Sequence, residues 1–274
     1  MNAITPTSES IAVVAKLTKD IRTAARAIKD NEARYLVKAY YTVQENRKAT
    51  ASQIRALEAA GQPIDVLDHF LSQYSTIERS IKRVLDIYTD NHPIGFWMKN
   101  ITGIGPIIAA GLLAHIDITK APTVGHIYSY AGLVPGQVWG KGQKRPWNAE
   151  LKKLCWLLGE SFVKKSNHED DIYGQYYKER KKQEIALNEQ GKFADQAQTI
   201  LRTKNIGKNT EDYKWYSEGK LPPAHIHARA KRYAVKLFLS HLHEVWYEHE
   251  YGIKPPQPYA IAHLGHAHRI EPPM

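Results

Sequence analysis

Nearly continuous helical periodicity is the feature that most constrains this chain. From residue 8 to residue 90, apolar side chains recur every three or four residues, and Gly61 and Pro63 are the only glycine and proline. That spacing places apolar residues on one side of an α-helix. Gly61 and Pro63 interrupt the pattern, and Asn91-His92-Pro93 ends it. The sequence therefore predicts a long helical hairpin with a further helix, as in coiled-coil arms and dimerisation bundles.

Three helices are expected in this region. The first runs from Ile11 to Ile28, and Asp30 and Asn31 offer a break and an N-cap before the second, which carries the apolar residues of positions 35–57. The third has one stripe, formed by Leu67, Phe70, Leu71, Tyr74, Ile77, Ile81, Val84, Leu85 and Tyr88. Basic and acidic residues nearly balance over positions 1–93, which is typical of a scaffold. We expect residues 8–90 to join copies of the chain into a homo-oligomer.

The rest of the chain changes in character. Residues 94–165 combine glycine-rich turns, short apolar helices and a basic run. Residues 166–274 contain polar helices with clustered cations (Lys178, Arg180, Lys181, Lys182), an amphipathic helix over 224–250, and a Pro- and His-rich tail that we expect to lie extended. Strand candidates are limited to 123–130 and 137–139. We therefore predict a mainly α fold with a helical arm (1–93), a central helix-hairpin-helix domain (94–165) and a C-terminal helical extension (166–274).

Charge and cysteine content narrow the partners and the compartment. The formal net charge of +10 favours a polyanion, either nucleic acid or anionic lipid. No stretch reaches the ~18 apolar residues of a membrane span, and Ile107–Ile116 is expected to be a buried helix. The single Cys155 cannot form an internal disulfide and has apolar neighbours, so we expect a core thiol in a reducing compartment. With no secretory pattern at the N-terminus, a cytoplasmic protein without membrane association is predicted.

The most specific local feature is the run Ile101-Thr-Gly-Ile-Gly-Pro106 followed by an apolar helix. Gly103 and Gly105 permit backbone angles that other residues avoid and leave room for a phosphate, and Pro106 suits the first helical turn. Free N–H groups at that helix N-terminus attract phosphate. Candidate phosphate-binding residues are Thr102, Gly103, Ile104 and Gly105. The alternative is a tight turn between two core helices that never meets nucleic acid.

A basic loop follows between Gly136 and Trp147. Lys141, Lys144 and Arg145 are candidate phosphate contacts, and Lys152, Lys153, Lys164 and Lys165 extend the basic surface on the next helix. Trp139 and Trp147 flank the loop, where an indole either stacks on an unpaired base or anchors the loop in the core. The anchor interpretation is favoured for Trp147 and left open for Trp139.

The run from Ile101 to Lys165, with GIGP, the later YAGLVP, a Gly/Lys loop and LKKLCWLL, resembles the C-terminal domain of the IS-one-ten insertion-sequence transposases, the bridge-RNA-guided recombinases. The helices of residues 8–90 resemble the coiled-coil region that precedes that domain, and the helix with Ala228–Ala234 resembles its closing helix. The resemblance implies a DNA-binding protein of transposition or recombination, with structured RNA as a further partner.

Two departures from that family bear on catalysis. Members carry an N-terminal nuclease-like domain whose four acidic residues bind metal, whereas this chain begins with the helical region, so we expect that half of the active site to be absent. The family's nucleophilic serine aligns with Gly140, which cannot attack a phosphodiester. Ser129, Tyr128 and Tyr130 are nearby hydroxyls, more typical of turn and core positions. No catalytic residue is assigned.

Paired histidines raise the question of a metal site. His225 and His227, His241 and His243, and His263, His266 and His268 form groups, with Glu244, Glu248 and His249 near the second. Residues two apart on a helix face different directions, and no His-Glu-x-x-His motif occurs. We expect structural or exposed histidines, no metal site and no cofactor.

The leading hypothesis is a DNA-binding transposase-family protein, truncated or divergent. Two alternatives remain: a self-sufficient recombinase or nuclease that uses Ser129, Tyr128 or the C-terminal histidines, and a non-catalytic helical assembly protein.

Overall fold

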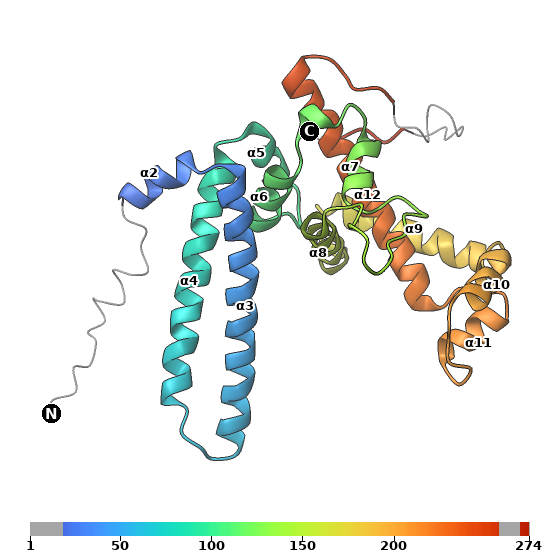
Figure 1. Cartoon of the computed structure of the whole chain (residues 1–274), viewed down its shortest axis with the longest axis horizontal. Coiled ribbons are helices and arrows are strands. Elements are labelled where there is room, and N and C mark those ends of the chain that lie inside the picture. The colour runs from blue at the N-terminus through green and yellow to red at the C-terminus, as the bar shows by residue number, and fades with distance from the viewer. Residues whose placement is uncertain (1–18, 258–268, 274) are drawn as a thin grey trace. The chain divides into compact units, whose positions relative to one another are not determined.

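A computed structural model describes residues 19–257 and 269–273. Over these residues all regular structure is helical, and no strand occurs. The chain divides into two compact units (Figure 1). The first contains the described residues up to Asn100 together with Gly105–Asp117, and the second contains Ile101–Ile104 and the described residues from Ile118 onward. The mainly α prediction is confirmed.

The first unit is built on two long helices that run side by side (Figure 1). Its elements are α2 (Lys19–Ala27), α3 (Asp30–Ala59), α4 (Asp65–Asp90), α5 (Pro93–Lys99) and α6 (Pro106–His115). The predicted hairpin and its turn at Gly61 are therefore confirmed, and the part of the first predicted helix before residue 19 lies outside the described residues. The cap predicted at Asp30 and Asn31 is wrong, because α3 starts at Asp30 and its N-cap Lys29 makes no side-chain hydrogen bond.

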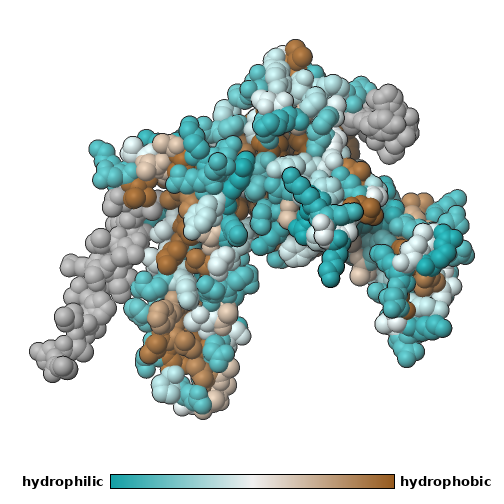
Figure 2. Space-filling model, viewed as in Figure 1, coloured by the Kyte–Doolittle hydropathy of each residue, from teal (hydrophilic) through white to brown (hydrophobic). Residues whose placement is uncertain are grey.

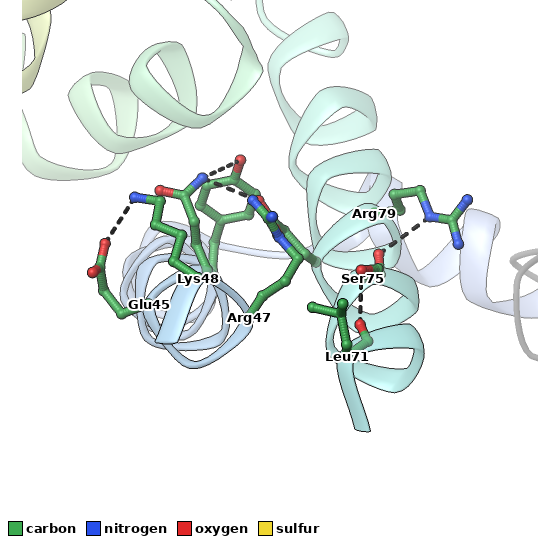
Figure 3. A network of polar contacts seen from close by, with 9 residues as sticks. Glu45, Arg47, Lys48, Leu71, Ser75 and Arg79 are labelled. Atoms are coloured by element: carbon green, nitrogen blue, oxygen red, sulfur yellow. Dashed lines mark hydrogen bonds and ion pairs between the residues drawn. The ribbon is translucent and has the colours of Figure 1, made fainter. Parts of the chain in front are cut away.

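Polar contacts join the two long helices. Arg47 Nε of α3 donates to Glu78 Oε2 of α4 over 2.5 Å, and Gln44 Nε2 donates to Glu78 Oε1 over 3.0 Å. Burial alone would raise the pKa of Glu78, but the bonds from Arg47 and Gln44 outweigh it and hold that pKa below its usual value. Figure 3 shows Arg47 beside α4, where Ser75 donates to the carbonyl of Leu71 over 2.8 Å. The Glu78 carboxylate thus links α3 to α4 and fixes how the two helices of the hairpin align.

Helix α6 is the buried element of this unit. It packs against α3, α4 and α5, and all of its residues from Ala109 to His115 are buried. Arg34 Nε of α3 donates to the Ala114 carbonyl over 2.5 Å, which satisfies an acceptor at the C-terminal end of α6. The prediction of a buried helix over Ile107–Ile116 is confirmed.

The second unit is organised around one long helix. Its elements are η1 (Ile118–Lys120), α7 (Val124–Tyr130), α8 (Ala149–Lys165), α9 (Ile172–Glu189), α10 (Ala194–Thr203), α11 (Glu211–Ser217) and α12 (Pro223–Tyr251). Helix α12 packs against α7, α8 and α9. Its Phe238 meets Phe162 of α8 and Tyr173 of α9, with ring centroids 5.9 and 5.4 Å apart. The helix predicted over 224–250 is confirmed.

The strand predicted over Thr123–Tyr130 is wrong, because these residues form α7. Val124 and Ile127 lie three positions apart and are both buried, and α7 packs on α12. The sequence offered this segment as one of two strand candidates, but its buried residues follow helical spacing. Residues 137–139 have no regular structure. Of the tail, residues 253–257 and 269–273 are not helical, and the remaining part, with His263, His266 and His268, lies outside the described residues.

Cys155 is a core residue, as expected. It is buried in α8, and burial raises the pKa of its thiol to about 12. None of the described helices combines the length and the apolar character needed to span a membrane.

Candidate nucleic-acid interface

The turn before α6 has the backbone that its glycines predict. Gly103 has a φ of +93°, a region that side chains with a Cβ avoid. Ile104 N donates to the Ile101 carbonyl over 3.0 Å and closes the turn. Gly105 then acts as the N-cap of α6 in an extended conformation, with Pro106 in the first turn. The first intrahelical bond runs from Ala109 N to Gly105 O, so the N–H groups of Ile107 and Ile108 have no intrahelical acceptor.

Helix α8 holds this turn in place. Ser161 Oγ donates to the Gly103 carbonyl over 2.5 Å. A Cβ at Gly103 would lie 3.4 Å from Phe162 Cδ1 and 3.8 Å from Lys165 Cγ, so the exposed Lys165 lies directly beside the turn. The open side of the turn is at Gly105, where a Cβ would have no neighbour within 4 Å.

The four candidate residues of the turn differ in what they can offer. Gly105 is exposed, and Thr102 and Gly103 are partly exposed. The Ile104 side chain is buried and its N–H group is already bonded to Ile101, so both of these groups serve the protein itself. An approaching phosphate can therefore reach backbone at Gly103 and Gly105 more readily than at Ile104.

The basic loop carries its cations on the surface. Lys141, Lys144 and Arg145 are all exposed. Trp139 is 46% exposed, its Nε1 donates to the Gln143 carbonyl over 2.6 Å, and the Arg145 guanidinium lies 4.7 Å from its ring centroid. Trp139 therefore orders the loop while keeping part of its ring open to solvent.

Trp147 has the anchoring role that the sequence favoured. A Cβ at Gly132 would lie 2.7 Å from its ring, so Gly132 and Trp147 are in close contact. Next to it, Asn148 caps α8 by accepting from Leu151 N over 3.0 Å, which fixes where the helix begins. Lys152 lies with its Nζ 4.1 Å from the Trp147 ring centroid, and Lys153 is exposed one position further.

Trp156, an aromatic residue of α8, was not singled out from the sequence. Trp156 is 56% exposed, and Lys231 Nζ of α12 lies 5.3 Å from its ring centroid. It follows Lys152 and Lys153 by four and three positions, so all three share one side of α8. That spacing was the available signal, because it placed a large ring among cations instead of on the apolar stripe.

Each hydroxyl considered as a nucleophile makes a hydrogen bond to another group of the protein. Tyr128 OH donates to the Lys236 carbonyl over 2.7 Å, and burial raises the pKa of its hydroxyl. Ser129 Oγ accepts from Gln137 Nε2 over 2.8 Å. Tyr130 OH accepts from Asn148 Nδ2 over 2.8 Å. Gly140 lies in the turn closed by Gln143 N and offers no hydroxyl.

The α12 histidines have structural roles. His241 is buried between the Tyr173 hydroxyl and the Ile270 carbonyl, at 2.8 and 2.9 Å. His243 Nε2 lies 2.7 Å from the Ala121 carbonyl. No group of His, Cys, Asp and Glu suited to a metal ion occurs among the residues that the structure describes.

Comparison with known proteins bears on the same segment. The model of the Transposase IS116/IS110/IS902 family matches residues 97–161, which run from α5 through the glycine turn, α6 and the basic loop into α8. No curated protein and no solved structure matches the chain. The glycine turn, the basic loop and most of α8 thus fall within one segment, residues 97–161, that matches the Transposase IS116/IS110/IS902 family domain.

Proposed function

We propose that this chain binds DNA through backbone phosphates and acts in DNA transposition. The observation that carries the proposal is the glycine turn of the transposase-family domain, which α8 holds rigidly while Gly105 stays exposed at the start of α6. A helix N-terminus presents N–H groups and a partial positive charge, which suit a phosphate oxygen.

The surrounding residues favour binding that tolerates any base sequence. Lys165 lies beside the turn, and Lys141, Lys144 and Arg145 are exposed on the loop. Lysine and arginine side chains are the usual partners of backbone phosphates, and a contact to phosphate carries no base sequence information. The exposed ring of Trp156 adds a stacking surface for an unpaired base. Structured RNA offers the same phosphates, so it is tested beside DNA.

The proposal assigns binding to this chain and strand cleavage to a partner. Gly140 has no hydroxyl, Tyr128 is buried, and Ser129 accepts a hydrogen bond from Gln137. The phosphate-binding turn and the cleaving groups would then come from different chains of one assembly.

The helical arm offers a surface for that assembly. Val66, Phe70 and Ile77 of α4 are exposed, and at 3.6 residues per turn they lie within about 40° of one another. Apolar side chains are visible on the surface of the α3–α4 hairpin in Figure 2. The sequence predicted Phe70 and Ile77 on one apolar stripe, and α3 leaves these two side chains exposed. We propose that a second copy of the chain covers the rest.

The test is fluorescence-anisotropy binding to mixed-sequence duplex DNA and to structured RNA over a salt series, comparing the wild type with Gly105→Val. The substitution adds bulk at the exposed N-cap without a clash, since a Cβ there has no neighbour within 4 Å. We expect salt-sensitive binding by the wild type and a loss of about 10-fold or more in the variant, the cost of a charge-assisted hydrogen bond.

Gly207→Val is the matched control, because Gly207 also has an ordinary φ and its nearest neighbour would be the Thr210 methyl at 3.4 Å. The control should bind as the wild type does. An absence of wild-type binding to either nucleic acid overturns the proposal, and equal binding by wild type and Gly105→Val removes the turn from it.

A further inference from the structure

A basic groove lies between α8 and α9, outside the segment that matches the transposase family. It has a volume of about 440 Å³. Three lysines of α9 line it, Lys178, Lys181 and Lys182, together with the apolar side chains of Val163 and Ile185. Lys181 and Lys182 follow Lys178 by three and four positions, so both lie on the same side of the helix as Lys178.

The cations of α9 fall into two groups. Arg180 Nη2 lies 2.7 Å from Glu184 Oε1, and Arg229 Nε of α12 donates to Glu184 Oε2 over 2.6 Å. Glu184 is 1% exposed, so this carboxylate is used up inside the protein. Arg180, which the sequence grouped with the lysines, therefore belongs to the internal network.

Unlike Arg180, the three lysines have no carboxylate partner among the described residues. None of them is within 4.0 Å of a carboxylate in the part of the chain that the structure describes. Three like charges on one helical face repel one another, which costs stability unless an anion binds there.

The floor of the groove suits more than a small anion. The buried Tyr177 contributes to it, with Lys181 Nζ 5.9 Å from its ring centroid and its hydroxyl 2.8 Å from His227 Nδ1. Val163 and Ile185 add aliphatic surface. Apolar surface between cations matches a sugar–phosphate chain, whose charged and less polar parts alternate. A free phosphate would leave the apolar part of the groove uncovered.

The groove adjoins the glycine turn through α8. Ser161, Phe162 and Lys165 face Gly103, whereas Val163 and Ser166 line the groove. The two surfaces thus share the last turns of one helix, at 1.5 Å rise per residue. A strand bound at the turn needs to pass only across the end of α8 to reach the lysines.

We propose that the α8–α9 groove is a second binding site for backbone phosphates, filled by the nucleic acid strand that the glycine turn holds. This inference rests on the proposed function and deepens it. The surface that binds nucleic acid would then extend beyond residues 97–161, and Lys178, Lys181 and Lys182 would contact backbone phosphates.

The first test compares two triple variants in the same salt series with the same duplex and RNA. Lys178→Gln, Lys181→Gln, Lys182→Gln empties the groove of charge, and Lys192→Gln, Lys204→Gln, Lys208→Gln removes equal charge from exposed lysines elsewhere in the unit. We expect the groove variant to bind about 10- to 100-fold more weakly, and its log–log salt slope to fall by roughly 0.9 for each lost contact with duplex DNA. The control should change little.

A second measurement needs no variant. Lysine acetylation read by mass spectrometry, with and without bound nucleic acid, should show protection of Lys178, Lys181 and Lys182 and none of Lys192, Lys204 and Lys208. Protection by DNA or by RNA identifies which supplies the phosphates.

Equal labelling of both sets, or a groove variant that binds as its control does, overturns the inference while Gly105→Val still tests the proposed function. If the wild type binds neither DNA nor RNA in the salt series, the proposed function and this inference are both overturned.

Discussion

Gly103 shows how one residue links backbone geometry to the candidate site. Its φ of +93° is outside the region open to other residues, and its carbonyl is held by Ser161. Gly105, two positions later, has a φ of −97° and open space around it. The first glycine is required by the fold, and the second is the one that leaves room for a ligand.

We therefore predict that the same change lowers stability at Gly103 and has little effect on stability at Gly105. Gly103→Ala should lower the free energy of unfolding by about 1–3 kcal/mol, because its backbone angles are strained for alanine and its Cβ meets Phe162 at 3.4 Å. Gly105→Ala should change it by less than about 0.5 kcal/mol, because the poorer N-cap preference of alanine is offset by the lower conformational entropy that it gives the unfolded chain. Urea denaturation followed by circular dichroism measures both, and equal values would contradict the assignment of strain to Gly103.

At the scale of a single element, α12 depends on neutral histidines. A carbonyl only accepts, so His241 Nε2 carries the proton given to Ile270, and Nδ1 accepts from the Tyr173 hydroxyl. His227 and His225 meet tyrosine hydroxyls in the same way, at 2.8 and 3.2 Å. Protonation would put a positive charge on a largely buried imidazole and would turn Nδ1 into a donor, so the tyrosine hydroxyl could no longer donate to it.

Stability should consequently fall in mild acid. Burial is the largest cause that lowers the pKa of His225, His227, His241 and His243 below 6.5. The unfolded chain then binds protons more readily than the folded one, so the free energy of unfolding decreases as pH falls from about 7 through the lowered values. Urea midpoints at pH 7.5 and 5.5 should show the decrease.

His241→Gln is the informative variant for this prediction. It should be less stable than the wild type at pH 7.5 and lose less stability between the two pH values, because one titrating group has gone. The exposed His168→Gln should keep the wild-type difference. A stability that is the same at both pH values would contradict the structural role of the four histidines.

At the scale of the whole molecule, the uncovered stripe of α4 governs assembly. Val66→Ser, Phe70→Ser, Ile77→Ser removes apolar surface that α3 leaves exposed. We expect light scattering to give twice the chain mass of 31.2 kDa for the wild type and the single mass for this variant.

The matched control changes exposed apolar residues of the other unit: Val138→Ser, Ile172→Ser, Ile253→Ser. It should keep the wild-type mass. A monomeric wild type, or a control that dissociates as the α4 variant does, would contradict assembly through the α3–α4 hairpin.

The sequence by itself determined the long helices and the glycine turn, because both follow from short-range rules. Apolar spacing predicted the hairpin and the helix over 224–250. Gly61 and Pro63 marked the turn of the hairpin, and Pro93 marked its end. The GIGP run fixed the turn before α6, since only glycine accepts the φ found at Gly103.

Only the tertiary structure decided which groups are paired and which are open. Glu184 is bonded to Arg229, 45 positions away, and to Arg180, and so separates Arg180 from the lysines beside it. The same holds for Trp156, which is exposed among cations, and for α7, a strand candidate in the sequence whose buried residues Val124 and Ile127 have helical spacing on a helix packed against α12. Burial and ion pairing depend on residues distant along the chain, and local spacing carries no record of them.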